Sequence, residues 1–124
     1  MSEAPKRTRV VWTETAVRCL ETLPKKVRAG LLAKADELEG CDDPEAVHKP
    51  LVGPLAGHHR ITYGRYRAIY KVVREELANG EMLYTATVYF IAAGIRKAHS
   101  KDDVYRLAEK IVGMGIVDPE PPKS

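Results

Sequence analysis

Apolar residues recur at two different spacings along this chain, helical in the first third and strand-like in the middle. From Ala16 to Leu23 and from Val27 to Leu38 they recur every three or four positions, which is typical of amphipathic helices. Thr13 offers a hydroxyl cap to the first helix. Pro24 suits the first position of the second, and Gly40 suits its end. The pattern predicts a helical hairpin.

Strand-like runs surround this hairpin in the sequence. A short β-rich run at 7–12 precedes it, and a turn-rich stretch at 41–54 follows. Alternating segments at 58–63 and 66–74, joined by a tight turn, and an apolar segment at 82–93 then predict three consecutive strands. Consecutive strands with short turns form an antiparallel meander.

The last regular segment is a helix. Ser100 and Asp103 resemble a capping box ahead of an apolar stripe that ends near Gly113. The predicted fold class is α+β: an antiparallel meander sheet with the N-terminal helical hairpin packed on one face, and a C-terminal helix. We expect one domain over residues 1–113 and a disordered tail over 114–124, which is rich in proline.

Size and cysteine content narrow the class of protein. The chain has 124 residues, enough for one domain with a sizeable core. Cys19 and Cys41 form neither a disulfide framework nor a metal set, so both are expected to be reduced thiols. No apolar run approaches a membrane span and no signal-peptide pattern is present, so we expect a soluble, cytoplasmic protein without membrane association.

Positive charge is concentrated in the middle of the chain. The net charge is only +3, yet the stretch from Ala46 to Arg74 contains no acidic residue. Its cations are Lys49, Arg60, Arg65, Arg67, Lys71 and Arg74. A field segregated in this way favours a polyanionic ligand. No Asp/Glu cluster accompanies it to hold Mg²⁺, so neither a metal nor another cofactor is expected.

Strand alternation predicts which of these side chains share a face. On the second strand, His58, Arg60 and Thr62 point away from the core. On the third, Arg67, Ile69 and Lys71 point to that same side, which the helices are expected to leave open. Arg60 would then lie near Arg67 or its neighbour. Two like charges without an acidic partner repel, which suggests that an anion belongs between them. The competing interpretation, a solubilising charge on an exposed strand, fits turn residue Arg65 best.

The sequence from Leu51 to Tyr70 carries a family resemblance. It resembles the central block of the RelE/ParE toxin superfamily, in which a "K-x-L-x-G" approach leads into two strands that end "G-x-Y-R-x-x-Y". The matching positions are Gly64, Tyr66, Arg67 and Tyr70. The resemblance covers about residues 8 to 112.

The resemblance implies the toxin of a type II toxin–antitoxin pair, with a cognate antitoxin protein as its partner. The RelE branch cleaves messenger RNA on the ribosome without metal, whereas the ParE branch inhibits DNA gyrase. A non-catalytic binding module of the same fold is a third alternative. We expect the first: an mRNA endoribonuclease that inhibits translation.

The resemblance also implies roles for individual residues. Arg60 and Arg67 match basic positions on the two strands, Arg96 matches the basic residue after the third strand, and Tyr105 resembles the tyrosine near the last helix. Lys97 and His99 compete with Arg96 for its role. Thr62 departs from the family pattern, because RelE itself has a lysine there that is proposed as a proton acceptor. Further candidates for RNA binding are Lys49, His58, Arg65, Lys71 and Lys97.

RNA self-cleavage requires a base for the 2′-hydroxyl proton, cations for the developing phosphorane charge and an acid for the leaving 5′-oxygen. Arginine suits the second task, and Arg60 and Arg67 are the candidates for it. With Thr62 unable to act as a base, His99 or His58 can replace it, and the basic loop before the last helix favours His99. Tyr105 could stack on a base or supply a hydroxyl.

Overall fold

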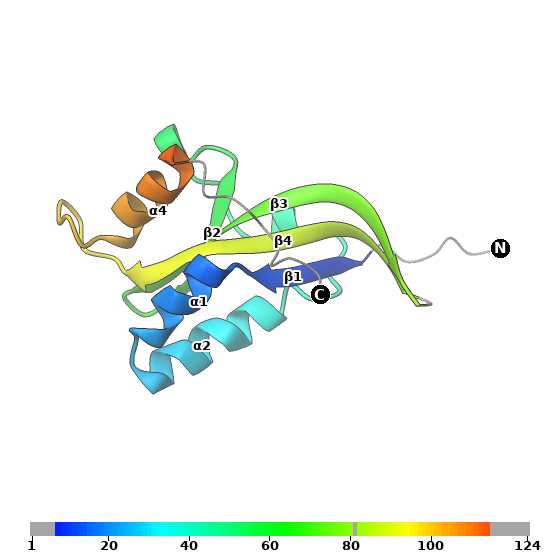
Figure 1. The fold of residues 1–124 in the computed structure, drawn as a ribbon, viewed down its shortest axis with the longest axis horizontal. Helices are drawn as coiled ribbons and strands as arrows, with labels where there is room; N and C mark the ends of the chain where they lie inside the picture. The colour runs from blue at the N-terminus through cyan, green and yellow to red at the C-terminus, as the bar shows by residue number, and fades with distance from the viewer. Residues whose placement is uncertain (1–6, 81, 115–124) are drawn as a thin grey trace.

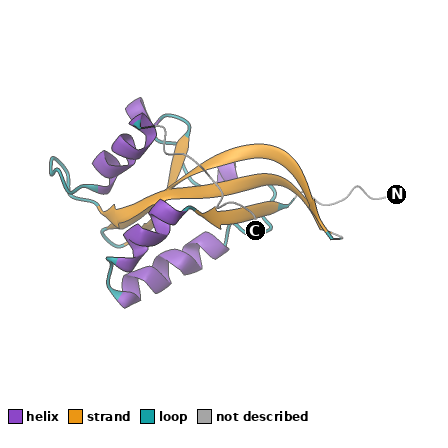
Figure 2. Ribbon diagram, in the orientation of Figure 1, coloured by secondary structure: helices purple, strands orange, loops and turns teal. Residues whose placement is uncertain are grey.

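The computed structural model describes residues 7–80 and 82–114 of the chain, and one four-stranded sheet organises them (Figure 1). The strand order is β1-β4-β3-β2. The strands are β1 (Thr8–Trp12), β2 (His58–Tyr63), β3 (Tyr66–Asn79) and β4 (Met82–Ile95). Helices lie on both sides of this sheet, as the colouring by secondary structure makes plain (Figure 2).

The sheet is mixed, which corrects the prediction of a purely antiparallel meander. β2, β3 and β4 do form the predicted antiparallel meander, but β1 adds to β4 in parallel, with Val10 opposite Val88. The helical hairpin carries the chain from β1 to β2 at the opposite edge of the sheet, and the meander then returns so that β4 lies beside β1. The α+β class is confirmed.

The helical hairpin is confirmed, with changes at its ends. α1 (Glu14–Glu21) begins after Thr13, whose hydroxyl accepts the Ala16 N–H as predicted. α2 (Lys25–Asp36) begins one residue later than predicted, with Pro24 as its N-cap, and ends before Gly40. The stretch predicted to be only turns contains two short helices, α3 (Pro44–Val47) and the 3-10 helix η1 (Gly53–Leu55).

The larger core lies between the hairpin and one face of the sheet. Leu31 of α2 and Leu38 from the turn after it pack in one cluster with Ile61 of β2 and Phe90 of β4, and all four are fully buried. The alternation predicted for β2 and β3 is confirmed on this face, with His59 also buried. His59 donates its Nδ1 proton to the His48 carbonyl oxygen at 2.9 Å, as expected of a satisfied core histidine.

A smaller core lies on the opposite face, under α4 (Val104–Gly113). A register shift in β4 leaves Ile91 as the extra residue between Phe90 and Ala92, so the consecutive residues Ile91 and Ala92 both lie in this smaller core. Ile69 of β3, predicted to lie on an open face, is fully buried by this helix layer. The part of this face under α4 is therefore closed.

The start of α4 differs from the predicted capping box. Asp103 is the N-cap and its carboxylate accepts the Tyr105 N–H, while the Ser100 hydroxyl accepts the Asp102 N–H in the preceding loop. Of the tail predicted at 114–124, residues 115–124 lie outside the described residues. Within the described part of the chain, no helix is long and apolar enough to span a membrane.

Candidate functional site

Arg60 reaches the margin of α4 from β2. Strand alternation turns Ile61 into the core and leaves Arg60 exposed on the α4 side of the sheet. Its guanidinium Nη1 donates to the Tyr105 hydroxyl oxygen at 2.9 Å. The two residues are far apart in the sequence, so this contact joins β2 to the first turn of α4.

Arg96 approaches the same tyrosine from the end of β4. Its backbone N–H donates to the Arg65 carbonyl oxygen at 2.7 Å, which fixes the strand end against the β2–β3 turn. Its guanidinium carbon lies 4.5 Å from the centre of the Tyr105 ring, a cation–π contact. The phenol of Tyr105 is therefore held at its face by one arginine and at its oxygen by another.

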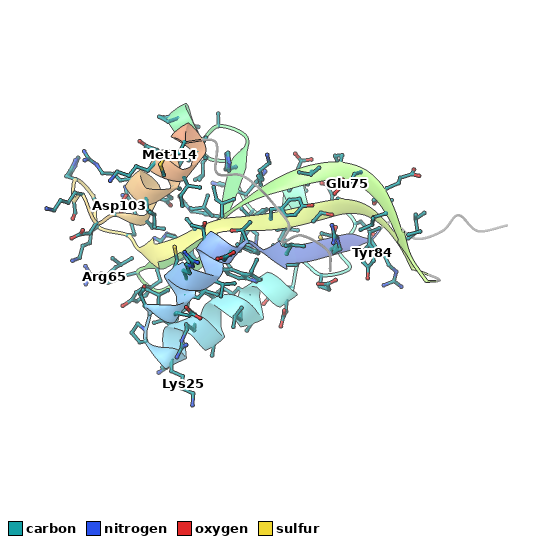
Figure 3. All side chains as sticks on the ribbon, in the orientation of Figure 1. Lys25, Arg65, Glu75, Tyr84, Asp103 and Met114 are labelled. Carbon is teal, nitrogen blue, oxygen red and sulfur yellow. The ribbon has the colours of Figure 1, made fainter. Side chains whose placement is uncertain are left out.

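Asp103, the N-cap of α4, binds the guanidinium of Arg96. Arg96 Nη1 donates to Asp103 Oδ2 at 2.7 Å, and only 4% of the aspartate side chain is exposed. Burial by itself raises the pKa of Asp103, but the hydrogen bonds from Arg96 and from the backbone N–H of Lys97, with the positive charge of Arg96, lower it below its ordinary value. Asp103 is thus ionised near neutral pH and forms an ion pair with Arg96. Figure 3 shows it where the loop after β4 meets α4.

These side chains line a pocket of about 430 Å³, within the size range of about 300–1,000 Å³ common for ligand sites. One wall is apolar and comes from the loop around η1, where Val52 is 86% exposed. The other walls are polar, and His99 lies on the rim with a positive φ of 66°. The lining residues are Leu51, Val52, Leu55, Arg60, Arg96, Ala98, His99, Asp103, Tyr105, Arg106 and Glu109.

Arg67 does not line this pocket. Its register partner is Thr62, whereas Arg60 lies opposite Ile69, so the two arginines share a face without meeting directly. Arg67 Nη1 donates instead to the carbonyl oxygens of Gly64 and Tyr66 at 2.9 and 3.0 Å. The β2–β3 turn thus occupies one of the guanidinium nitrogens that were expected to face phosphate, and Nε is buried without a hydrogen-bond partner among the described residues.

None of the predicted RNA-binding residues lines the pocket. Lys49, Arg65 and Lys97 are exposed in loops or turns. His58 and Lys71 are half-buried register partners at the start of β2. Burial lowers the pKa of His58, and both of its ring nitrogens are buried without a hydrogen-bond partner among the described residues. Of the two candidate bases, only His99 lies at this pocket.

Sequence reasoning missed three polar residues of the pocket. Asp103 was recognised only as a possible cap, and Arg106 and Glu109 were not singled out at all. The position of Arg106 next to Tyr105, outside the apolar stripe of α4, was the available signal. Within residues 7–80 and 82–114, no group of three or more His, Cys, Asp or Glu side chains is arranged to hold a metal ion.

The fold and pocket define an α+β protein that presents two arginines around one tyrosine at the margin of its sheet, where an anion can reach them. Comparison with solved structures finds similarity to a chain of the RelBE2 toxin–antitoxin complex from Mycobacterium tuberculosis. The two chains are 30% identical with a TM-score of 0.52, and the match covers 71% of this chain and 96% of that chain. Comparisons with protein-family models and with curated proteins find no match.

A relative with this identity and coverage assigns the family. The chain belongs to the RelE/ParE toxin superfamily and is a RelE-like toxin. The resemblance carried by residues 51–70 is thereby confirmed.

Proposed function

We propose that this protein is the toxin of a type II toxin–antitoxin pair and acts as a metal-independent endoribonuclease on mRNA, with the ribosome as the place of action. The observation that carries the proposal is the convergence of Arg60 and Arg96 on Tyr105, at a pocket that His99 also lines. This arrangement contains a candidate base, a fixed cation and a hydroxyl donor within one site.

The proposed reaction is an internal transesterification of RNA. His99 takes the proton of a 2′-hydroxyl, whose oxygen attacks the adjacent phosphorus as the bond from phosphorus to the 5′-oxygen breaks. Arg60 stabilises the charge that develops on the phosphorane oxygens. The 5′-oxygen takes a proton, and the products are a 2′,3′-cyclic phosphate and a 5′-hydroxyl.

Tyr105 is the proposed donor to the leaving oxygen. Arginine has no hydrogen-bond acceptor, so the contact with Arg60 uses a lone pair of the Tyr105 oxygen and leaves the hydroxyl proton available. The contact with Arg96 limits rotation of the ring. The proton can therefore be directed into the pocket.

A cognate antitoxin is the proposed protein partner. The similar structure is a toxin–antitoxin complex, and an acidic antitoxin segment would complement the cations at this pocket. Charge reversal at Arg60 should then slow antitoxin association and weaken its dependence on salt, in addition to removing cleavage.

The decisive experiment compares Tyr105→Phe with Tyr84→Phe on purified protein and mRNA, with and without ribosomes and EDTA. Tyr84 lies near the start of β4, outside the pocket, so Tyr84→Phe is a control that also removes one hydroxyl group. We expect Tyr105→Phe to slow cleavage strongly and Tyr84→Phe to leave it unchanged, and we expect wild-type products to end in a 2′,3′-cyclic or 3′-phosphate in EDTA. Abolition by EDTA contradicts the mechanism. Intact RNA together with inhibited gyrase supercoiling would instead establish the ParE-like activity.

A further inference from the structure

Asp103 lies where three parts of the site meet: the loop after β4, the first turn of α4 and the pocket wall. Its Oδ1 accepts the Lys97 N–H at 2.6 Å. Its Oδ2 accepts from Arg96 Nη1 at 2.7 Å and from the Tyr105 N–H at 3.2 Å. Three of the roughly four lone-pair sites of a carboxylate are therefore used by this chain itself.

We propose that Asp103 is a positioning residue that holds the Arg96 guanidinium over the Tyr105 ring, so that Arg96 orients the tyrosine while Arg60 alone serves as the phosphate-stabilising cation. The proposal deepens the proposed function and rests on it. It gives different tasks to Arg60 and Arg96, which both contact Tyr105.

Charge supports this division. The formal charges of Arg96 and Asp103 cancel across a contact of 2.7 Å, in a place where water is largely excluded from the carboxylate. Arg60 has no ion pair with any described residue, although Glu109 lines the same pocket. A phosphate entering the pocket therefore meets an uncompensated cation at Arg60 and a neutralised pair at Arg96.

The contacts of Tyr105 support the positioning role. Asp103 fixes its backbone N–H, Arg96 covers its ring, and Arg60 binds its oxygen. Two of these three contacts depend on Asp103, directly or through Arg96. A catalytic group that shifts by about 1 Å can lose about 10²-fold in rate, so the aspartate can influence catalysis without touching substrate.

The first test is Asp103→Asn, with Asp102→Asn as the matched control. Asparagine caps helices about as well as aspartate, so α4 is expected to remain folded. The ion pair is lost, and we expect kcat to fall by about 10²-fold with KM changed less than about threefold. Asp102 has no ion pair with the described residues, and its variant should retain wild-type kinetics. A lower KM with unchanged or higher kcat would overturn the proposal, because the freed Arg96 would then be a phosphate ligand.

The second test asks whether Asp103 acts through Tyr105. In a Tyr105→Phe background, which removes the hydroxyl to be positioned, Asp103→Asn should lower the residual rate by less than about threefold. Losses that multiply as independent factors would overturn the positioning role. Arg96→Lys should behave like Asp103→Asn, because lysine retains the charge but has no planar group to lie on the ring. An increase in KM without loss of kcat would contradict this.

An NMR readout separates this proposal from the proposed function. If wild-type protein cleaves no RNA, the proposed activity fails, yet the positioning of Tyr105 remains measurable by its labelled ring signals. Asp103→Asn should shift these signals, and Asp102→Asn should leave them in place. Unchanged Tyr105 signals in Asp103→Asn would overturn the positioning role whether or not cleavage is observed.

Discussion

The sheet face under α1 and α2 differs from the face under α4 in how it holds polar groups. Under the hairpin, polar groups are closed into the core: the Tyr70 hydroxyl donates to the Pro44 carbonyl oxygen at 2.9 Å, and the His59 ring stacks on Tyr70. Under α4 the apolar core is smaller, and two arginines meet a tyrosine at its open margin. One face stabilises the fold, and the other leaves charged groups accessible.

This difference follows from what covers each face. The hairpin supplies two helices, whereas α4 is a single helix of ten residues that reaches only part of its face. Side chains beyond its edge can be long and charged without losing hydration. Catalytic groups at such an edge rest on a rigid sheet while they remain open to a large substrate.

The largest expected effect is at Phe90, at the centre of the hairpin-side core. Its ring stacks on Trp12 with centroids 4.1 Å apart and is fully buried. Phe90→Ala should lower the free energy of unfolding by about 3–5 kcal/mol, measured by urea denaturation. Leu107→Ala, at a half-buried position of α4, should cost less. Equal losses would show that the two cores contribute alike.

The second largest effect is expected at Arg60, on the α4 side of the sheet, and concerns RNA cleavage. Arg60→Ala should slow RNA cleavage by about 10²–10³-fold, because it removes an oriented donor to developing charge. Arg60 is exposed, so the urea midpoint should change little. Arg18→Ala, an exposed arginine of α1, is the control. Full activity of the Arg60 variant would contradict the assignment of this pocket as the active site.

The third effect tests how closely α2 packs on the sheet. A Cβ added at Gly30 would overlap the ring of Tyr63, so Gly30→Ala should destabilise by about 1–3 kcal/mol. Helix propensity alone predicts the opposite sign, a gain of about 1 kcal/mol. In a Tyr63→Ala background the substitution should become neutral or stabilising. A stabilising effect in the wild-type background would contradict this close contact.

Much of the fold could be predicted from the sequence, because apolar periodicity and turn residues are local signals. The hairpin, the meander and α4 follow from them. The parallel pairing of β1 with β4 could not, since a five-residue strand carries no information on which edge it joins. The short helices α3 and η1 were hidden by Pro44 and Pro54, which indicate turns in the sequence.

The site was less predictable because it depends on the directions of long side chains. Alternation placed Arg60 and Arg67 on one face, but it could not show that carbonyl oxygens of the turn would bind Arg67. The grouping of Arg60 with Tyr105 required the position of α4. Asp103 gave a helix-cap signal, and nothing in its spacing indicated the ion pair with Arg96.

The smallest expected effect is the acid sensitivity that Asp103 gives to the α4 side of the sheet. Hydrogen bonds and the charge of Arg96 lower its pKa in the folded state below the ordinary value of 3.8, against the opposing effect of burial. The ionised carboxylate therefore makes its full contribution to stability at pH values above the unfolded-state pKa of 3.8. That contribution is lost as the pH falls through the lower pKa of the folded state. Asp103→Asn should be less stable than wild type at pH 5, with the difference narrowing toward pH 2 in thermal unfolding. A difference that stays constant over this range would show that the ion pair with Arg96 adds nothing to folding. In that case the only contribution of Asp103 to stability would be its cap on α4.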